Sequence, residues 1–377
     1  MLWRVYSMPG GRWREKCVVH YDQAVTNFFF EHFQDKGRRC LIIGGAGFDP
    51  RSSEIVRCLS QVLGNRLQAL MLKEERPDPG SELVRRANGN LELIRSYCTN
   101  LTVESLQIFA GDGAVIGGHN AIRVLKEFEL SAFTDIVVDI SALSLGISFP
   151  ITSFIYQVAQ KASADLNVHL TLLSNPTLDT AIHTEPNDVA SRARGFGVPE
   201  LYGEDEKAIL WLPVLSENKQ HVLRTIYARV KPHDTCPILP FPSEDPQKGD
   251  RIAYGVFKSI RSDFGGPLEN EWSLEAQNFL YSDERRPLDI YRSILRIAEE
   301  RERVFEVFGG SSIVLSPVGS KIPAIGALMA ALECQFPVVY VEALAYTVDW
   351  AKVDSCAEAG SRMTHVWLYG NAYKSDF

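Results

Sequence analysis

Short, fully apolar runs alternate with helical patterns along most of this chain. In the first half, each apolar run is followed by a loop and then by a segment with helical spacing of its apolar residues. The apolar runs are residues 41–44, 67–72, 106–110, 136–140 and 168–174. Strands of this kind, separated by helices, are typical of parallel sheets covered on both faces. The sequence therefore predicts an α/β fold with an open, Rossmann-like parallel sheet.

The same alternation begins again in the second half of the chain. The apolar runs there are residues 208–212, 236–241, 313–315 and 338–341. We therefore expect an N-terminal extension over 1–35, a first Rossmann-like lobe over 36–200 and a second over 206–377, with loop and linker over 175–205. A distant internal duplication would explain the repeated plan, although two unrelated α/β lobes would give a similar pattern.

Composition narrows the possible partners. The net charge of −8 argues against broad binding to duplex DNA, which needs a basic face, but it is compatible with one anion in a local basic pocket. Seven scattered cysteines without a C-x-x-C motif are typical of reduced thiols, so we expect a cytoplasmic protein. No apolar run reaches about 18 residues, so we expect no membrane span.

The first candidate site is the loop Gly319-Ser320-Lys321, between an apolar run and a helical pattern. In parallel sheets, ligands gather at the carboxyl ends of strands, where the next helix presents unpaired N–H groups and a partial positive charge. A glycine, a hydroxyl and a cation at that place favour a phosphate or another anion. The alternative is an ordinary strand-to-helix turn with a solvated lysine.

The second candidate is the glycine-rich loop after the first apolar run. Gly44, Gly45 and Gly47 form part of a dinucleotide-binding pattern, but Pro50 follows where the full G-x-G-x-x-G motif needs glycine. Phe48, Asp49 and Arg51 complete this candidate, with Arg51 as a second cation for the same ligand. Without a ligand, the loop is a turn in which Asp49 or Ser52 caps the next helix.

Further candidates follow other apolar runs. They are Ser141 and Ser144 in the first half, and Ser216, Glu342 and Tyr346 in the second. Glu342 and Tyr346 are placed where a ribose hydroxyl or a base could be held. Turns, helix caps and ordinary aromatic packing would explain the same residues.

The sequence shows no complete catalytic or metal-binding pattern. It lacks H-E-x-x-H, G-x-S-x-G and paired cysteines, and its eight histidines show no metal-ligand spacing, so we predict no metal site. If the chain is an enzyme, Asp49, Asp112, Asp139 and His119 are the candidates for a catalytic base. No particular cofactor is expected beyond a nucleotide-type phosphate ligand.

The run LSPVGSKIPAIGALMAALE, followed by PVVYVEA, resembles the loop, helix and strand of CRISPR-associated Rossmann-fold (CARF) domains. Gly319, Ser320 and Lys321 match the phosphate-binding loop of that family, while the corresponding loop in the first half has no lysine. The related SAVED domains are similar to two such lobes in one chain. The resemblance implies a sensor of cyclic or linear oligonucleotide messengers in antiphage defence.

From these observations we expect a phosphate-bearing ligand in a crevice between the lobes. No effector segment is evident in the sequence, so the resemblance implies a separate protein effector or a homo-oligomer. One alternative is an enzyme that uses a nucleotide sugar or NAD, since two α/β lobes also describe such enzymes. Another is a scaffold whose loops bind no small molecule.

Overall fold

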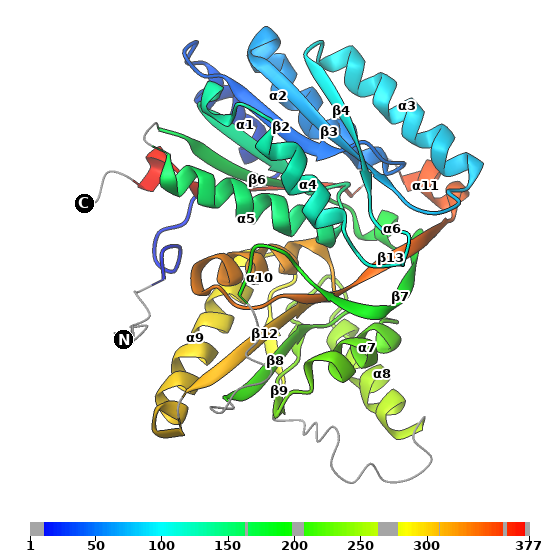
Figure 1. Ribbon diagram of the computed structural model, residues 1–377, viewed down its shortest axis with the longest axis vertical. Coiled ribbons are helices and arrows are strands. Elements are labelled where there is room, and N and C mark those ends of the chain that lie inside the picture. The colour runs from blue at the N-terminus through cyan, green and yellow to red at the C-terminus, as the bar shows by residue number, and fades with distance from the viewer. Residues whose placement is uncertain are drawn as a thin grey trace. The chain divides into compact units, whose positions relative to one another are not determined.

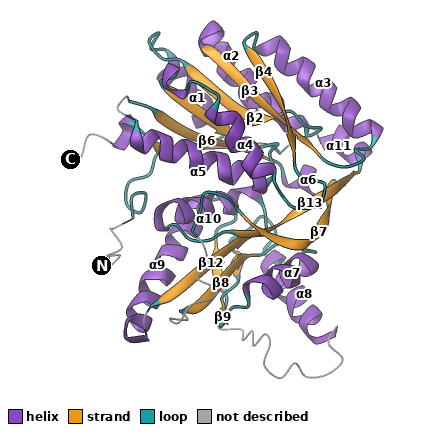
Figure 2. Cartoon of the chain, in the orientation of Figure 1, coloured by secondary structure: helices purple, strands orange, loops and turns teal. Residues whose placement is uncertain are grey.

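The computed structural model describes residues 11–162, 165–197, 207–262, 278–308, 310–356 and 360–373. Helices and parallel strands alternate along the chain, which confirms the predicted α/β class (Figures 1 and 2). The chain forms two compact units. Unit 1 contains Met1–Lys16 and Asp188–Val341, and unit 2 contains Cys17–Asn187 and Glu342–Phe377.

Unit 2 is built on a seven-stranded sheet. In spatial order its strands are β1 (Val19–Tyr21), β14 (Arg362–Tyr369), β6 (Asn167–Ser174), β5 (Asp135–Asp139), β2 (Cys40–Gly45), β3 (Leu67–Glu75) and β4 (Leu101–Gln107). The five strands from β6 to β4 are parallel to one another. Only β14 runs the other way, antiparallel to both β6 and β1.

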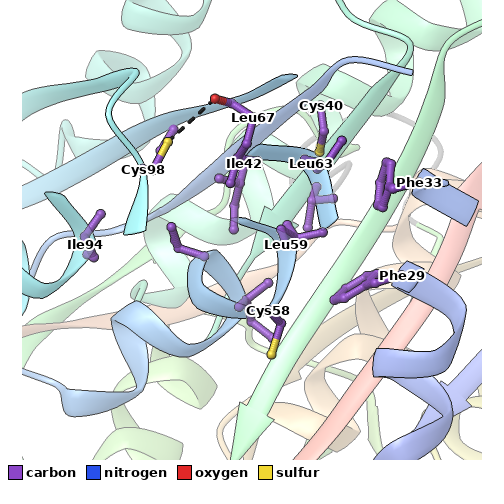
Figure 3. Packing of buried hydrophobic residues seen from close by; sticks show 14 of the residues in the cluster. Phe29, Phe33, Cys40, Ile42, Cys58, Leu59, Leu63, Leu67, Ile94 and Cys98 are labelled. Carbon is purple, nitrogen blue, oxygen red and sulfur yellow. Dashed lines mark hydrogen bonds between the residues drawn. The ribbon is translucent and has the colours of Figure 1, made fainter. Parts of the chain in front are cut away.

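Helices cover both faces of this sheet. They are α1 (Gln23–Phe33), α2 (Glu54–Leu63), α3 (Ser81–Tyr97), α4 (Gly117–Lys126) and α5 (Leu145–Lys161). Right-handed crossovers place α2 and α3 on one face and α4 and α5 on the other, as Figure 1 shows. Between the sheet and helices α1 and α2 lies a core that includes Phe29, Phe33, Ile42 and Leu59 (Figure 3).

Unit 1 is built on a smaller sheet of parallel strands. Its strands are β11 (Leu280–Ser282), β10 (Ile238–Pro240), β8 (Ala208–Val214) and β12 (Ser311–Pro317), with β9 (Asp234–Thr235) also paired to β8. Its helices are α7 (Gln220–Val230), α8 (Lys248–Ser262), α9 (Pro287–Phe305) and α10 (Lys321–Cys334). Helix α10 is apolar on nearly every side and is buried over most of its length, which such a composition requires.

Both units contain a point at which the strand order reverses. In unit 2, β2 lies between β3 and β5; in unit 1, β8 lies between β10 and β12. At such a switch point, the chain leaves the carboxyl ends of two neighbouring strands in opposite directions. This opens a crevice between the two loops, in which ligands commonly bind. The two units share this strand order, and an internal duplication stays a prediction.

Several expected boundaries need correction. β4 ends at Gln107, whereas we expected a strand over 106–110, and β7 (Ile182–Arg192) lies in a stretch expected to be loop. β7 pairs with β13 (Val339–Val348), which extends well beyond the expected 338–341. Both strands have mixed polar and apolar residues, because neither is covered on two faces as the parallel strands are.

The lobe boundaries also differ from those expected. β1 and α1 lie in the expected extension over 1–35, yet they belong to unit 2, as does the C-terminal strand β14. The reason is pairing, because β14 forms ladders with both β1 and β6. The expected boundary at 200–206 lies outside the described residues.

Two further short α-helices are α6 (Pro176–Asp179) and α11 (Trp350–Cys356). Over the described ranges, no helix combines the length and the apolar character needed to cross a bilayer.

Candidate functional site

A small pocket with a cavity volume of about 30 Å³ lies at the carboxyl edge of the unit 1 sheet. Its walls come from residues at or just after the ends of β8, β10 and β11, and from the loop between β12 and α10. The polar residues that line it are Ser216, Lys248, Ser282, Glu284 and Ser320. The pocket thus lies at the switch point between β8 and β12.

The loop before α10 is shaped by a glycine. A Cβ atom on Gly319 would lie 3.0 Å from the carbonyl oxygen of Leu215, so glycine allows the loops after β8 and β12 to approach closely. Ser320 follows as the N-cap of α10, lines the pocket and makes no side-chain capping hydrogen bond. The structure therefore brings together three predicted site residues, Ser216, Gly319 and Ser320.

Lys321 is the first residue of α10 and is half-buried. The lysine that lines the pocket is a different one, Lys248, at the start of α8. Lys248 forms an ion pair with Glu284, and their side chains are 26% and 15% exposed. Sequence reasoning missed both residues, because they follow β10 and β11, two short strands separated by a long helical segment.

The remaining predicted residues belong to unit 2, where they form internal contacts at the carboxyl edge of that sheet. Arg51 lies between two carboxylates, with Nη2 2.6 Å from Asp49 Oδ2 and Nη1 2.7 Å from Asp179 Oδ1. Burial alone would lower the pKa of Arg51, but the charges of Asp49 and Asp179 and their hydrogen bonds raise it. The predicted second cation is thus already neutralised by residues of its own unit.

A second buried ion-pair cluster contains Glu342. Arg76 Nη2 lies 2.8 Å from Glu342 Oε1, and Arg76 Nη1 lies 2.8 Å from Glu74 Oε2. Burial, followed by the neighbouring charge of Glu74, raises the pKa of Glu342. The guanidinium of Arg76 lies 5.0 Å from the ring centroid of Tyr346, and the ring of Phe48 lies 5.2 Å from that of Tyr346.

The loops after β2 and β5 touch each other at the unit 2 switch point. A Cβ atom on Gly45 would lie 2.6 Å from the carbonyl oxygen of Ala142, so these two loops approach closely. Ser144 donates its backbone N–H to Glu74 Oε1 at 2.7 Å, so a carboxylate of the chain occupies the N-terminus of α5. At the carboxyl edge of the unit 2 sheet, the position that corresponds to the unit 1 pocket is therefore occupied by Glu74 and by the close contact of Gly45 with Ala142.

The other predicted residues in unit 2 have structural contacts. Ser141 is fully buried, donates to Asp139 and accepts the N–H of Leu173 at 2.7 Å. Gly44 is buried within β2, and the carbonyl of Gly47 accepts a hydrogen bond from Asn90 at 2.9 Å.

The candidate catalytic residues also have structural contacts or places. Asp49 and Asp139 are paired as described above, and Asp112 accepts the N–H of Ala114 in a turn. His119 lies in the first turn of α4. Each of the three aspartates that were candidates for a catalytic base therefore accepts hydrogen bonds from nearby residues of the chain.

No protein-family model matches this chain, and no curated protein is similar enough in sequence to count as a relative. The geometry of the two units is therefore the basis for proposing a function.

Proposed function

We propose that the chain is a sensing module that binds a phosphate-bearing nucleotide or oligonucleotide in the unit 1 pocket. One observation carries the proposal. Ser216 after β8, Ser320 before α10 and Lys248 at the start of α8 converge on a pocket at the switch point of a parallel sheet.

The electrostatics of this edge suit an anion. A helix N-terminus carries the positive end of the helix dipole and N–H groups without partners inside the helix, and at α10 Ser320 adds a hydroxyl donor. Lys248 supplies a cation, which its ion pair with Glu284 now holds in the pocket wall. A bound phosphate would compete with Glu284 for that cation.

Unit 2 supports this interpretation by analogy. Ser144 and Ser320 are N-caps with nearly the same backbone angles, φ −67° and ψ 160° against φ −66° and ψ 160°. At Ser144 the helix N-terminus binds the carboxylate of Glu74. A phosphate group at Ser320 would accept hydrogen bonds at the N-terminus of α10, as the Glu74 carboxylate does at the N-terminus of α5.

The size of the pocket indicates what kind of ligand fits. A cavity of about 30 Å³ is too small to enclose a nucleoside, so the rest of such a ligand would lie over the rim. Next to the lining residues Pro240 and Ser282 are Phe241 and Tyr281, two exposed aromatic residues whose ring centroids are 6.2 Å apart. Aromatic rings beside a phosphate site favour nucleotides, since bases stack on them.

Binding, rather than turnover, is the function that the pocket chemistry favours. Among the residues described around the pocket, Ser282 donates to Asp289 at 3.0 Å, and the one lysine is paired with a carboxylate. Neither arrangement pairs a nucleophile with a histidine base. As in the antiphage sensors that the sequence resembles, we propose that a separate effector chain, or a second copy, responds to the bound state.

Isothermal titration calorimetry of the full chain tests this proposal. The ligands are ATP, NAD, UDP-glucose, a cyclic dinucleotide and a cyclic oligoadenylate. We expect one phosphate-rich class to bind. Lys248→Met should weaken that binding about tenfold, since a charge-assisted contact is worth about 1.5–3 kcal/mol. The exposed Lys126 provides a control, because Lys126→Ala should bind as the wild type does.

Two outcomes would count against the proposal. If no ligand of the panel binds, or if Lys248→Met and Lys126→Ala bind equally well, the unit 1 pocket is not the site. Steady consumption of NAD or UDP-glucose by the pure protein would instead favour the enzyme alternative.

A further inference from the structure

Four of the eight histidines gather around one buried carboxylate in unit 2. They are His20 in β1, His32 in α1, His169 in β6 and His365 in β14, and the carboxylate is Asp135 at the start of β5. These residues come from five separate elements, so no local spacing in the sequence reveals them. The cluster belongs to the half of the sheet where β5 begins, away from the carboxyl edge.

Two histidines lie within hydrogen-bonding distance of the same oxygen of Asp135. His32 Nε2 lies 2.7 Å from Asp135 Oδ1, and His169 Nε2 lies 3.2 Å from the same atom. These three donor atoms all lie within 4.8 Å of one another. Two imidazole nitrogens and one carboxylate oxygen that converge in this way form a ligand set typical of zinc and related divalent ions.

The spacing of the donor atoms is close to that of a metal site. Zinc ligands lie about 2.0–2.1 Å from the ion, so two ligands at a tetrahedral angle are about 3.3 Å apart. The separation of His169 Nε2 from Asp135 Oδ1 is 3.2 Å, which already fits. The separation for His32 is 2.7 Å, so the His32 ring needs to move by only about half an ångström.

Neighbouring groups orient the three donors. The second carboxylate oxygen of Asp135, Oδ2, accepts from Thr134 Oγ1 at 2.6 Å and from Arg38 Nη1 at 3.2 Å. Oδ1, which faces the two histidines, also lies 3.3 Å from Arg38 Nη1. The second ring nitrogen of His169, Nδ1, lies 3.0 Å from His365 Nε2. Metal-binding histidines and carboxylates are usually held by such outer hydrogen bonds.

The site is enclosed by aromatic rings. The side chains of Asp135 and His169 are fully buried, and that of His32 is 7% exposed. Phe28 stacks on His32 and His365, and Trp367 contacts His32 and His169 edge-on or tilted. A shell of this kind limits access by water and keeps the ligands in place.

The hydrogen bonds to His365 and His20 add a chain that can change direction. When each ring is neutral and His169 donates to the Asp135 carboxylate, His365 must donate to His169 and His20 to His365, whose Nδ1 lies 2.9 Å from His20 Nδ1. A metal on His169 Nε2 would move that proton to Nδ1, so each later hydrogen bond would reverse. The half-buried His20 would then carry its proton on Nε2, and the number of protons would stay the same.

We propose that His32, Asp135 and His169 bind one divalent transition-metal ion of the zinc class, which joins α1, β5 and β6. His365, Thr134 and Arg38 are positioning residues for this site. The proposal concerns unit 2 alone and does not depend on the ligand proposed for unit 1.

Metal titration of the full chain tests the proposal. The protein is stripped with a chelator, and Zn²⁺ and Co²⁺ are then added while binding is followed by calorimetry and elemental analysis. We expect about one ion per chain, with Co²⁺ giving the visible absorption of a four-coordinate site with nitrogen and oxygen ligands. Thermal melting should shift upward with Zn²⁺, because the ion binds the folded chain.

Variants separate this site from surface histidines. His32→Ala should abolish the Co²⁺ absorption, and His32→Gln, which can still donate to Asp135, serves if His32→Ala does not fold. His365→Gln should weaken binding about tenfold or more through loss of the outer hydrogen bond. His183→Ala is the matched control, since His183 is exposed in β7 of the same unit.

The proposal is overturned if the wild-type chain binds no ion tightly. It is equally overturned if His32→Gln and His183→Ala bind Zn²⁺ with the same stoichiometry and affinity as the wild type, because the ions would then lie on surface residues.

Discussion

The backbone N–H of Ser144 donates a hydrogen bond to the Glu74 carboxylate at 2.7 Å, so the N-terminus of α5 already carries an anion. At the same position in unit 1, Ser320 lines a pocket instead. Two helices with similar N-caps thus have different neighbours. This difference is why we place the ligand in unit 1 and treat the unit 2 candidates as structural.

The first prediction concerns the carboxylate in the unit 1 pocket. Glu284→Gln removes the charge that pairs with Lys248, so a phosphate would no longer compete with it. We expect the ligand found by calorimetry to bind several-fold more tightly to this variant. Glu300→Gln is the control, because Glu300 is paired with Arg303 on an exposed part of α9. Weaker binding to Glu284→Gln would mean that Glu284 itself contacts the ligand.

The second prediction concerns the buried ion pairs of Arg76. Arg76→Met would leave Glu74 and Glu342 buried without their cation, and the loss of one partner in such a cluster costs about 3–5 kcal/mol. We expect a matching fall in the free energy of unfolding, measured with urea. Arg303→Met removes an exposed ion pair and should cost less than about 1 kcal/mol. Equal effects of the two substitutions would contradict a buried cluster.

The third prediction is a pH dependence at Glu342. Its pKa is raised in the folded chain above the ordinary value of 4.5, so the folded state binds more protons than the unfolded state just above that pH. The contribution of Glu342 to stability is therefore present at low pH and is lost as the pH rises. Glu342→Gln cannot titrate, so its melting temperature relative to the wild type should rise as the pH is raised above about 4.5.

A companion variant checks the cause of this shift. Glu74→Gln removes the neighbouring charge that helps to raise the pKa of Glu342. In that background, the pH dependence of the Glu342→Gln effect should become smaller. A difference between Glu342→Gln and the wild type that stays constant with pH would show that Glu342 is ionised throughout.

The fourth prediction tests the close approach of two loops in unit 2. A Cβ atom at Gly45 would lie 2.6 Å from the backbone oxygen of Ala142, whereas one at Gly47 would meet nothing within 4 Å. Gly45→Ala should therefore destabilise the fold by about 1–3 kcal/mol, as overpacked sites do. Gly47→Ala should be close to neutral in the same thermal melts. A neutral Gly45→Ala would show that the loops can separate at little cost.

The sequence predicted most of the parallel strands, because each is a short apolar run between helical patterns. It missed β14, although THVWLY is strand-like, since nothing in a linear pattern shows that the last strand pairs with β1 and β6. β7 was missed for another reason, because its composition is polar and includes Pro186 and Asn187. β7 and β14 are therefore strands because they pair with segments that are distant in the sequence, and local propensity alone does not predict them.

The site was predictable in part. Glycine and serine after a buried strand correctly indicated a loop at the sheet edge that lines a pocket, and Ser216 and Ser320 do meet there. Lys248 and Glu284 could not be found from motifs, because their positions depend on how β10 and β11 pair. Likewise, His169 and His365 stand within apolar strands, and only the pairing of β6 with β14 brings them together.

The position of β14 has a consequence for how the chain is made. This strand lies between β1 and β6, yet in synthesis it follows the whole of the 188–341 segment that belongs to unit 1. On the ribosome, the strand β1 therefore lacks its sheet neighbour until residues 362–369 have emerged. His365 is part of that strand, so the histidine cluster is complete only after the 188–341 segment and β14 have been synthesised.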